Sequence, residues 1–465
     1  MSPDETAKAA GPEPMAFAPR LTVEPMPSAW SPIKRVGFRM AFIFFFCFIF
    51  LYGNGTIFSP IPIVGDFLEH WLTWPTDAFV EWLGQHVFHL TGIAAHWHPT
   101  GSGDTTLNWI QNGLFCVYAL AGGLVWTGVA VARGNRRLEY RTLDGWLRFG
   151  LRLSSGAAML SYGLAKLFPL QMAPISIAVL NEPLGNSSPM TLLWSLVGMH
   201  PAYEMICGAA EAAGGVLLLY RRTTLLGALV SAFVMTNVVL YNFFFDVPVK
   251  LFATFLLLAC LFLALPDAPA LFRFFWQHRP VAPSGVWFPE VRRRGWRIAT
   301  HTAEWAFVLM FLIVMPMNRA KRWTDAEKAA KGQSALLGAW KLDAGQQVSG
   351  PSSSFVTPEG LPATDLYVDT VARAFTRSSD GTLWRTRLAI DERAKTLGVR
   401  FFRGTGVDYR WSMPDADHVV MVSHSVKPDP AFHAETLRWT RTPLPSHYPL
   451  LDRGFHLVNQ WGLER

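Results

Sequence analysis

The chain has 465 residues, of which 51% are hydrophobic and only 16% charged, and it carries a net charge of +7. A soluble domain has roughly 25% charged residues, so this composition indicates a protein that lies largely in lipid. The Lys and Arg clusters adjoin apolar runs, where membrane topology explains them, and we expect no nucleic-acid partner. All four cysteines fall within apolar runs and none forms a Cys-x-x-Cys pair, which argues against a disulfide framework.

Seven apolar runs approach the length of about 20 residues that spans the hydrocarbon core of a bilayer. They cover residues 38–52, 109–132, 149–168, 201–220, 223–244, 249–265 and 298–317. Residues 1–37 are polar and Pro-rich at their start and predict a disordered cytoplasmic segment, and the first run is interpreted as a signal anchor. The fold class that we predict is mainly α, a polytopic transmembrane helix bundle of about seven spans.

The distribution of Lys and Arg predicts the orientation of these spans. Residues 53–107 and 169–200 contain no Lys or Arg, whereas the connections at 133–148, 221–222 and 273–297 are rich in Arg. Basic loops stay in the cytoplasm, so the N-terminus is predicted to be cytoplasmic. Residues 267–319 then form a basic cytoplasmic loop and the seventh span. An odd number of spans places the C-terminal domain outside the bacterial inner membrane.

The first two spans, within residues 38–147, are joined by a His-rich outer loop at 53–107. Phe79, Leu83, Val87 and Leu90 recur there at helical spacing, which predicts an amphipathic helix in the outer interface of the bilayer. Residues 190–199 are predicted to form a second such segment. The Gly-rich stretch at 100–106 is interpreted as a turn in which Asp104 or Thr105 caps the second span.

Histidine is concentrated in this loop and raises the question of a metal site. His86 and His89 can share a helix face, and His96 and His98 could add two more ring nitrogens for zinc, copper or haem iron. The spacing matches no defined metal motif, and an interfacial helix also tolerates histidine. Metal binding is therefore the weaker of the two interpretations.

Polar residues within the third to sixth spans are the candidate functional site, because a charge in hydrocarbon is costly and usually has a partner. Candidate catalytic residues are Lys166, Glu204 and Glu211. Candidate ligand-binding residues are Asn237, Tyr241, Asn242 and Asp246. Counting inward from the basic ends places nearly all of them in the outer half of the membrane.

Two interpretations of these residues are open. In the structural one, Lys166–Glu204 and Asp246–Lys250 are ion pairs and Asn237 bonds neighbouring helices. In the functional one, the residues line an outward-facing pocket for a quinone, a lipid headgroup or a small anion. An unpaired Glu211 would then be driven toward its neutral form, as suits a residue that relays protons.

Three short motifs occur in order within residues 148–266. They are Gly-Leu-Ala-Lys-Leu at 163–167, Gly-Ala-Ala-Glu-Ala-Ala-Gly-Gly at 208–215 before a Leu-rich run and Arg221-Arg222, and the single residue Asn237. With them the block resembles the four-helix membrane module of the DoxX/DoxD family. The resemblance implies a respiratory or redox-linked membrane protein, similar to the small subunit of thiosulfate:quinone oxidoreductase, and it makes Lys166 and Glu211 the leading site positions. The chain departs from a plain module by its extra spans and C-terminal domain.

Residues 335–465 have the composition of a separate extracytoplasmic domain. Strand-like runs occur at 365–370, 384–390, 398–402, 408–413, 418–424 and 436–440, with turn residues between them. They predict a β-barrel or β-sandwich. Leu337-Gly-Ala-Trp340 resembles the opening Gly-x-Trp of lipocalin-like barrels.

The function predicted from these features is that of a redox- or quinone-linked component of a membrane oxidoreductase system. The sequence leaves the cofactor open, with quinone as one candidate and a metal as the less favoured one. Two alternatives remain. One is a non-catalytic scaffold that recruits a membrane or extracytoplasmic protein through its C-terminal domain, and the other is a transporter-like protein that binds a lipid or small molecule. The sequence contains no flavin, haem or iron–sulfur motif, so whether the chain is itself an enzyme stays open.

Overall fold

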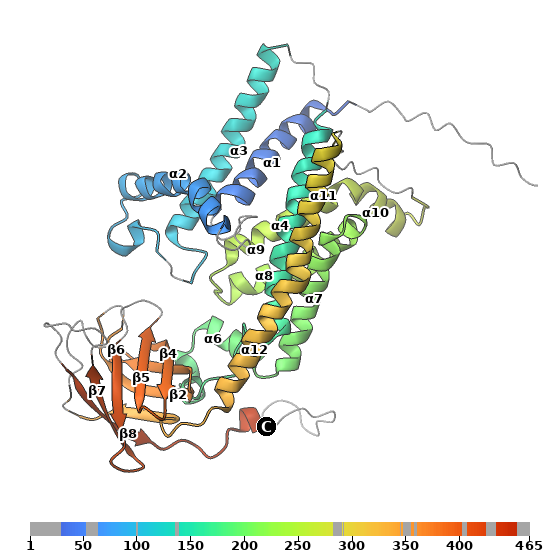
Figure 1. The fold of residues 1–465 in the computed structure, drawn as a ribbon. Coiled ribbons are helices and arrows are strands. Elements are labelled where there is room, and N and C mark those ends of the chain that lie inside the picture. Colours follow the sequence, from blue (N-terminus) through green and yellow to red (C-terminus); the bar gives the residue numbers. More distant parts are fainter. Residues whose placement is uncertain are drawn as a thin grey trace, which may run out of the picture.

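A computed structural model shows a helical bundle joined to a β-barrel (Figure 1). It describes residues 29–52, 64–98, 101–134, 139–281, 291, 293–344, 346, 355–357, 360–401, 407–424 and 434–452. The predictions for most of residues 1–37 and for the last 13 residues lie outside the described residues.

The helices follow the predicted apolar runs closely. The long ones are α1 (Pro32–Leu51), α2 (Val64–His86), α3 (Thr106–Ala132), α4 (Arg141–Leu167), α7 (Pro201–Leu219), α8 (Thr224–Phe244), α9 (Lys250–Ala264), α11 (Arg294–Leu309) and α12 (Met315–Lys331). Shorter ones are α5 (Ile177–Leu180), α6 (Pro189–Gly198), α10 (Ala268–Phe275) and α13 (Pro449–Asp452). A π-helical turn at Met310–Val314 joins α11 to α12, so that the two form one long rod.

Among the described residues, 5 segments are long and apolar enough to cross a membrane. They are Thr106–Ala132, Pro201–Leu219, Arg221–Phe244, Lys250–Phe275 and Arg294–Lys331. Helices α1 and α4 coincide with two further predicted spans but carry more charged and polar residues. The structure therefore confirms an apolar helical bundle, while the count of seven spans stays a prediction.

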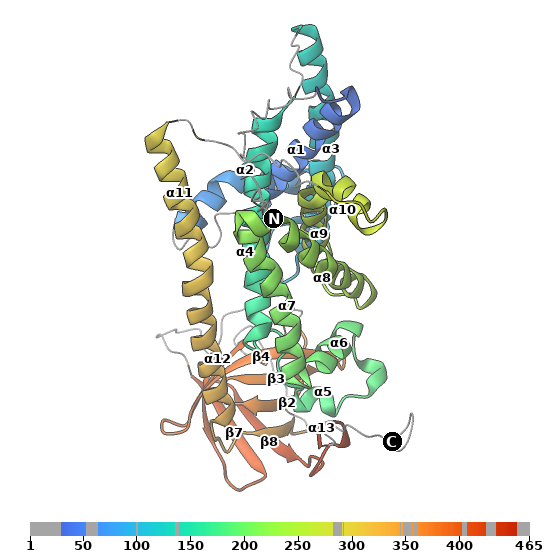
Figure 2. The ribbon, with the colours of Figure 1, turned by 90° about the vertical axis from the view of Figure 1, so that its right-hand side faces the viewer.

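The two ends of the helical bundle differ. Helix α4 packs along α7, α1 along α3, and α8 along α9. The Arg-rich ends of α3, α4 and α11 point away from the barrel, which lies at the other end of the bundle (Figures 1 and 2). These three helix ends therefore lie opposite the barrel, whereas α12, which leads into the barrel, carries five basic residues of its own: Arg319, Lys321, Arg322, Lys328 and Lys331.

Eight antiparallel strands close into a barrel in simple sequential order. They are β1 (Gly338–Leu342), β2 (Ala363–Thr370), β3 (Arg373–Ser378), β4 (Leu383–Asp391), β5 (Thr396–Phe401), β6 (Val407–Ser412), β7 (His418–His424) and β8 (Thr436–Thr442). Trp340, Tyr409 and Trp439 are fully buried in the barrel core. Side chains fill the interior, as is common for barrels of about eight strands. The predicted β-rich domain is confirmed as a barrel.

The Gly-x-Trp segment forms strand β1. Trp340 lies under the guanidinium of Arg441 from β8, which sits 4.2 Å from the ring centroid. Arg441 also donates a hydrogen bond of 3.0 Å to the Leu337 carbonyl. The first and last strands are therefore joined by a cation–π contact in addition to their backbone ladder.

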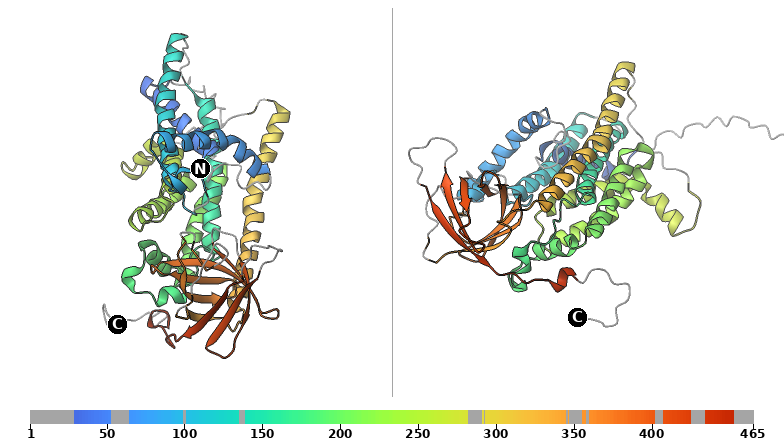
Figure 3. Two further views of the ribbon diagram at one scale, coloured as in Figure 1. Left: turned by 90° about the vertical axis from the view of Figure 1, so that its left-hand side faces the viewer. Right: turned by 60° about the horizontal axis from the view of Figure 1, so that its bottom comes forward.

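The barrel wall rests against the connection between α4 and α7. Asp369 of β2 accepts hydrogen bonds from the Ile177 backbone N–H at 2.9 Å and the Ser176 hydroxyl at 3.0 Å. Arg377 of β3 forms an ion pair with Glu182 at 2.6 Å. Two further views show the barrel at this end of the bundle, with α12 leading into it (Figure 3). The barrel is thus docked onto the bundle through its side as well as through its linker.

Candidate functional site

Paired glycines bring the backbones of α4 and α7 into direct contact. A Cβ added at Gly208 would lie 2.4 Å from the Leu167 backbone nitrogen, and one added at Gly163 would lie 2.5 Å from the Ala212 nitrogen. Gly215 and Gly156 form a second close pair further along the helices. Small residues allow helix backbones to approach in this way in membrane bundles. The glycines of both motifs are therefore explained by packing.

This close approach places Lys166 of α4 opposite Glu211 of α7. The Lys166 ammonium donates to both carboxylate oxygens of Glu211, each at 2.8 Å. Both side chains are only 5% exposed. The structural interpretation paired Lys166 with Glu204, which is wrong, and the functional one considered an unpaired Glu211, whereas Glu211 is paired. The two leading candidates are each other's partners.

The ion pair borders a cavity of about 210 Å³, which we call the ion-pair cavity. Tyr241 and Asn242 of α8 also line it, so four of the predicted site residues meet there. Other lining residues that the sequence did not single out are Met159, Tyr162, Gln171, Met190, Trp194, Met235 and Phe252. These are aromatic, Met and amide side chains in or next to apolar segments. Only their convergence on this cavity in the folded structure identifies them as candidate site residues.

Glu204, Asn237 and Asp246 do not line the ion-pair cavity. Glu204 is fully buried and accepts hydrogen bonds from the backbone N–H of Gln171 and Met172, so it holds the turn after α4. Asn237 is exposed on α8, and no hydrogen bond of its side chain is found among the described residues. Asp246 is 81% exposed and forms the predicted ion pair with Lys250 at 2.7 Å. These three residues are therefore structural or peripheral.

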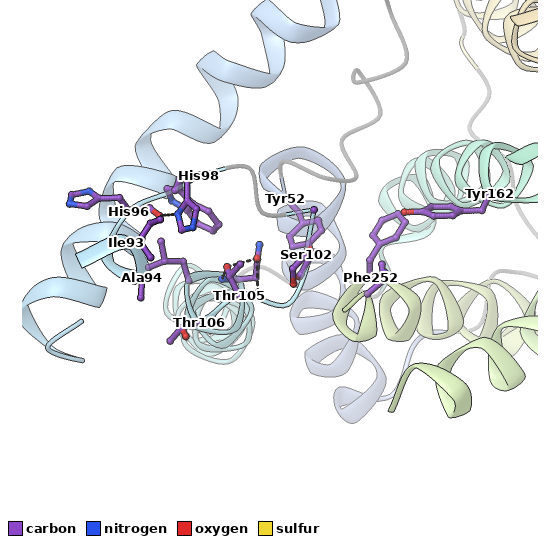
Figure 4. Close-up of a pocket in the computed structure, with 16 residues that line it drawn as sticks. Tyr52, Ile93, Ala94, His96, His98, Ser102, Thr105, Thr106, Tyr162 and Phe252 are labelled. Atoms are coloured by element: carbon purple, nitrogen blue, oxygen red, sulfur yellow. Dashed lines mark hydrogen bonds between the residues drawn. The ribbon is translucent and has the colours of Figure 1, made fainter. Parts of the chain in front are cut away.

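A larger cavity of about 840 Å³ lies beside the first one and is lined mainly by residues within 93–98 and 101–108 (Figure 4). We call it the His-loop cavity. It shares Gly101, Tyr162, Val249 and Phe252 with the ion-pair cavity. Tyr162 and Phe252 lie at one side of it, and His96 and His98 lie at the other (Figure 4). The two cavities are therefore neighbours across a wall of two aromatic rings.

The four candidate metal ligands are not gathered into one group. His86 lies in α2 and its ring nitrogen contacts the Trp82 carbonyl, while His89 has a positive φ of 54° just beyond the helix. His96 lies 3.8 Å from Glu81, and the His98 ring contacts the His96 carbonyl. Throughout the described ranges, no group of three or more His, Cys, Asp or Glu side chains is placed to hold a metal ion.

The turn before α3 joins the His-rich loop to the bundle. Thr105 is the N-cap of α3 and forms a capping box with Asn108, as predicted. Asp104 instead accepts hydrogen bonds from the backbone N–H of Lys250 and Leu251, at 2.6 and 3.0 Å. Asp104 therefore caps α9, the helix that supplies Phe252 to both cavities.

A third cavity, of about 650 Å³, lies where residues 171–195 face strands β3 and β4 of the barrel. We call it the junction cavity. It shares Gln171, Met190 and Trp194 with the ion-pair cavity. The three cavities thus form a continuous band from the His-rich loop to the barrel.

Comparison with known proteins finds one informative relative. The uncharacterized protein YwoB of Bacillus subtilis (strain 168) is 33% identical to this chain over 106 residues, which make up 23% of the chain and 67% of YwoB. The chain belongs to the YwoB family. That membership covers a quarter of the chain and brings no activity with it, because YwoB is described only as uncharacterized.

Two other comparisons give no match. No protein-family model matches the chain. No solved structure matches it either. The functional argument therefore rests on the geometry of the cavities.

Proposed function

We propose that this chain is a seven-span bacterial inner-membrane protein that binds the ring of a quinone in the ion-pair cavity, as the quinone-linked component of a membrane redox system. The observation that carries the proposal is the buried Lys166–Glu211 pair at the wall of an otherwise mainly apolar cavity. Intramembrane ionisable residues that face a cavity commonly mark substrate or proton pathways.

The partners of the charged residues in α4 support its assignment as a span. Arg148 pairs with Asp144 at 2.9 Å, Arg152 pairs with Glu304 of α11, and Lys166 pairs with Glu211. Paired charges that face the bundle interior are tolerated within a membrane. With α1, whose Lys34 and Arg35 lie in its first turn, α4 brings the number of spans to seven.

The position of the Arg-rich ends of α3, α4 and α11 supports an extracytoplasmic barrel, against the five Lys and Arg residues of α12 at the barrel end. The Arg-rich helix ends lie at one end of the bundle and the barrel at the other (Figure 1). Since basic ends remain in the cytoplasm, the barrel and all three cavities would open on the outer side. The barrel then covers the outer end of α4 and α7 rather than acting at a distance from it.

The size and lining of the ion-pair cavity suit a single substituted ring. An engineered cavity of about 150 Å³ binds benzene, so 210 Å³ holds a ring with small substituents. Tyr162, Tyr241 and Asn242 offer hydrogen-bond donors to the two carbonyl oxygens of a quinone. Glu211 would exchange protons with the bound quinone, while Lys166 compensates its charge. The electrons would come from a partner redox protein.

Titration of purified protein with a short-chain ubiquinone tests this proposal. Trp194 lines the cavity, so a bound quinone should quench tryptophan fluorescence. We expect Tyr241→Phe and Asn242→Ala to weaken binding by about tenfold, in line with about 1.4 kcal/mol for a hydrogen bond. Asn237→Ala is the matched control on the same helix, and it should bind like the unchanged protein. Equal affinity in all variants would contradict the proposal.

A further inference from the structure

The junction cavity adjoins the ion-pair cavity, shares Gln171, Met190 and Trp194 with it, and is otherwise lined by different residues. Its walls are the polar segment 186–188, the start of α6, and the outer faces of strands β3 and β4. Arg373 and Arg385 line it from the barrel side. Strand register places Arg385 opposite Phe375, and Arg387 opposite Arg373.

Arg385 is the uncompensated charge of this cavity. Arg373 is held by Asp369 at 3.0 Å and donates to the Pro174 carbonyl, and Glu182 is engaged by Arg377. Within the described part of the chain, Arg385 has no ion pair within 4 Å and no hydrogen bond, and Asp369, which is held by Arg373, acts on it only through space. Arg385 is an exposed residue of β4. Desolvation by the surrounding atoms and the neighbouring guanidiniums of Arg373 and Arg387 lower the pKa of Arg385, and Asp369 opposes this shift. An anion bound beside it would relieve this repulsion.

The acidic residues of the cavity do not neutralise Arg385. Asp380 accepts hydrogen bonds from the Ser378 hydroxyl, the Thr382 hydroxyl and the Thr382 backbone N–H. Its carboxylate is therefore committed to its own turn. The hydroxyl of Ser187 and the amide of Asn186 line the opposite wall as neutral hydrogen-bond donors.

The surroundings of the cavity favour a lipid as the source of the anion. Helix α6 is short and apolar, and its Leu192 and Leu196 are exposed by 39% and 65%. Leu184, just before it, is 74% exposed. Such side chains enter the apolar edge of a bilayer. Met190 and Trp194 line both this cavity and the ion-pair cavity, so an apolar chain has a path alongside α6.

We propose that the junction cavity binds the phosphate group of an anionic membrane lipid, with Arg385 as its principal cation and the acyl chain lying along α6. Guanidinium groups bind phosphate through paired hydrogen bonds, which makes Arg the fitting residue type. The barrel would then hold the lipid headgroup against the bundle. This inference concerns a separate site and does not rest on quinone binding.

Native mass spectrometry of the full-length protein in detergent tests the proposal with three probes: dioctanoyl phosphatidic acid, dioctanoyl phosphatidylcholine and inorganic phosphate. We expect phosphatidic acid to bind most tightly and Arg385→Gln to weaken its binding at least fivefold. Arg385→Lys keeps the charge but loses the paired N–H donors of the guanidinium. Its affinity for phosphatidic acid should lie between those of Arg385→Gln and the unchanged protein. Arg410→Gln removes an exposed Arg from β6, which does not line the junction cavity, and should bind like the unchanged protein.

Thermal unfolding of each variant separates lost binding from lost folding, and we expect Arg385→Gln and Arg410→Gln to unfold at the same temperature. Inorganic phosphate binding as tightly as phosphatidic acid would overturn the lipid assignment. Equal binding of phosphatidic acid by Arg385→Gln and the unchanged protein would overturn the site. A Tyr241→Phe variant should leave this binding unaltered, which keeps the result distinct from the quinone test.

Discussion

Lys166 and Glu211 are 45 residues apart in the chain, yet the Lys166 ammonium lies 2.8 Å from both carboxylate oxygens of Glu211. Among the described residues, neither side chain forms a second ion pair. The pair therefore either supports the helix packing or serves the cavity beside it. The two roles predict different effects of substitutions on stability and on quinone binding.

Replacing both members of the pair separates its structural role from its role in binding. Lys166→Met or Glu211→Leu alone leaves a buried unpaired charge, which costs about 3–5 kcal/mol of unfolding free energy. The double variant should recover most of that stability, because two apolar side chains need no partner. Unfolding in detergent, followed by tryptophan fluorescence, measures all three variants.

The same double variant should bind quinone more weakly, since the charged part of the polar wall of the ion-pair cavity is gone while Tyr162, Tyr241 and Asn242 remain. A double variant as unstable as the single ones would show that the pair is not coupled as described. Full quinone binding by the stable double variant would assign the pair to packing alone.

The contact between α4 and α7 predicts a strong effect of a single methyl group. Gly208→Ala places a Cβ 2.4 Å from the Leu167 nitrogen, so the helices must separate, and we expect a loss of about 1–3 kcal/mol of unfolding free energy. Gly113→Ala on α3 is the control, because nothing lies within 4 Å of its added Cβ. That control should be neutral or stabilising by up to about 1 kcal/mol. Equal stability of the two variants would argue against backbone contact.

Capping of α9 by Asp104 predicts unequal roles for two acidic residues near Lys250. Asp104→Ala removes an acceptor from two backbone N–H groups and should cost about 0.5–2 kcal/mol. Asp246→Ala removes only an exposed ion pair, worth about 0–1 kcal/mol. Thermal unfolding of the two variants compares them, and a larger loss for Asp246→Ala would refute the capping role.

Docking of the barrel through Asp369 predicts a local change in amide exchange. Asp369→Ala removes the acceptor of the Ile177 N–H, so hydrogen exchange over residues 176–181 should accelerate while the barrel strands stay protected. Asp417→Ala, at the exposed end of β7, should leave that exchange unchanged. Unaltered exchange in the Asp369 variant would show that other contacts hold the barrel.

The exposed pair of Asp415 and His418 predicts a pH-dependent contribution to barrel stability. Their hydrogen bond of 2.8 Å lowers the pKa of Asp415 and raises the pKa of His418. The His418 contribution is lost as pH rises through its raised pKa, and the Asp415 contribution is lost as pH falls through its lowered pKa. The pair therefore stabilises most between the two unperturbed values, about 4 and about 6.5.

Histidine NMR titration of the full-length protein measures this shift. Asp415→Asn should return the pKa of His418 toward its usual range, because the carboxylate is the main cause of the rise. A His418 pKa that does not move would rule out the pairing in solution.

The sequence alone determined the features that depend on neighbours along the chain. Apolar runs of span length became the helices of the bundle, and the helix with Pro201 at its start begins at that residue. Thr105 caps α3 and Asp246 pairs with Lys250, both within four residues of their partners. Six of the strands were predicted from alternation and turn residues, but β3 was not, because its inward residues Ala374, Thr376 and Ser378 are small or polar.

Only the tertiary structure decided which distant residues meet. Lys166 pairs with Glu211 rather than Glu204 because the glycine contacts set how α4 and α7 face each other, and a shift of about two helical turns would change the partner. Likewise Tyr162, Gln171, Trp194 and Phe252 became cavity residues through packing. The histidines, close in sequence, did not converge. Periodicity and charge are local properties that a sequence displays, whereas a site depends on the distances between elements, and those distances are set by packing.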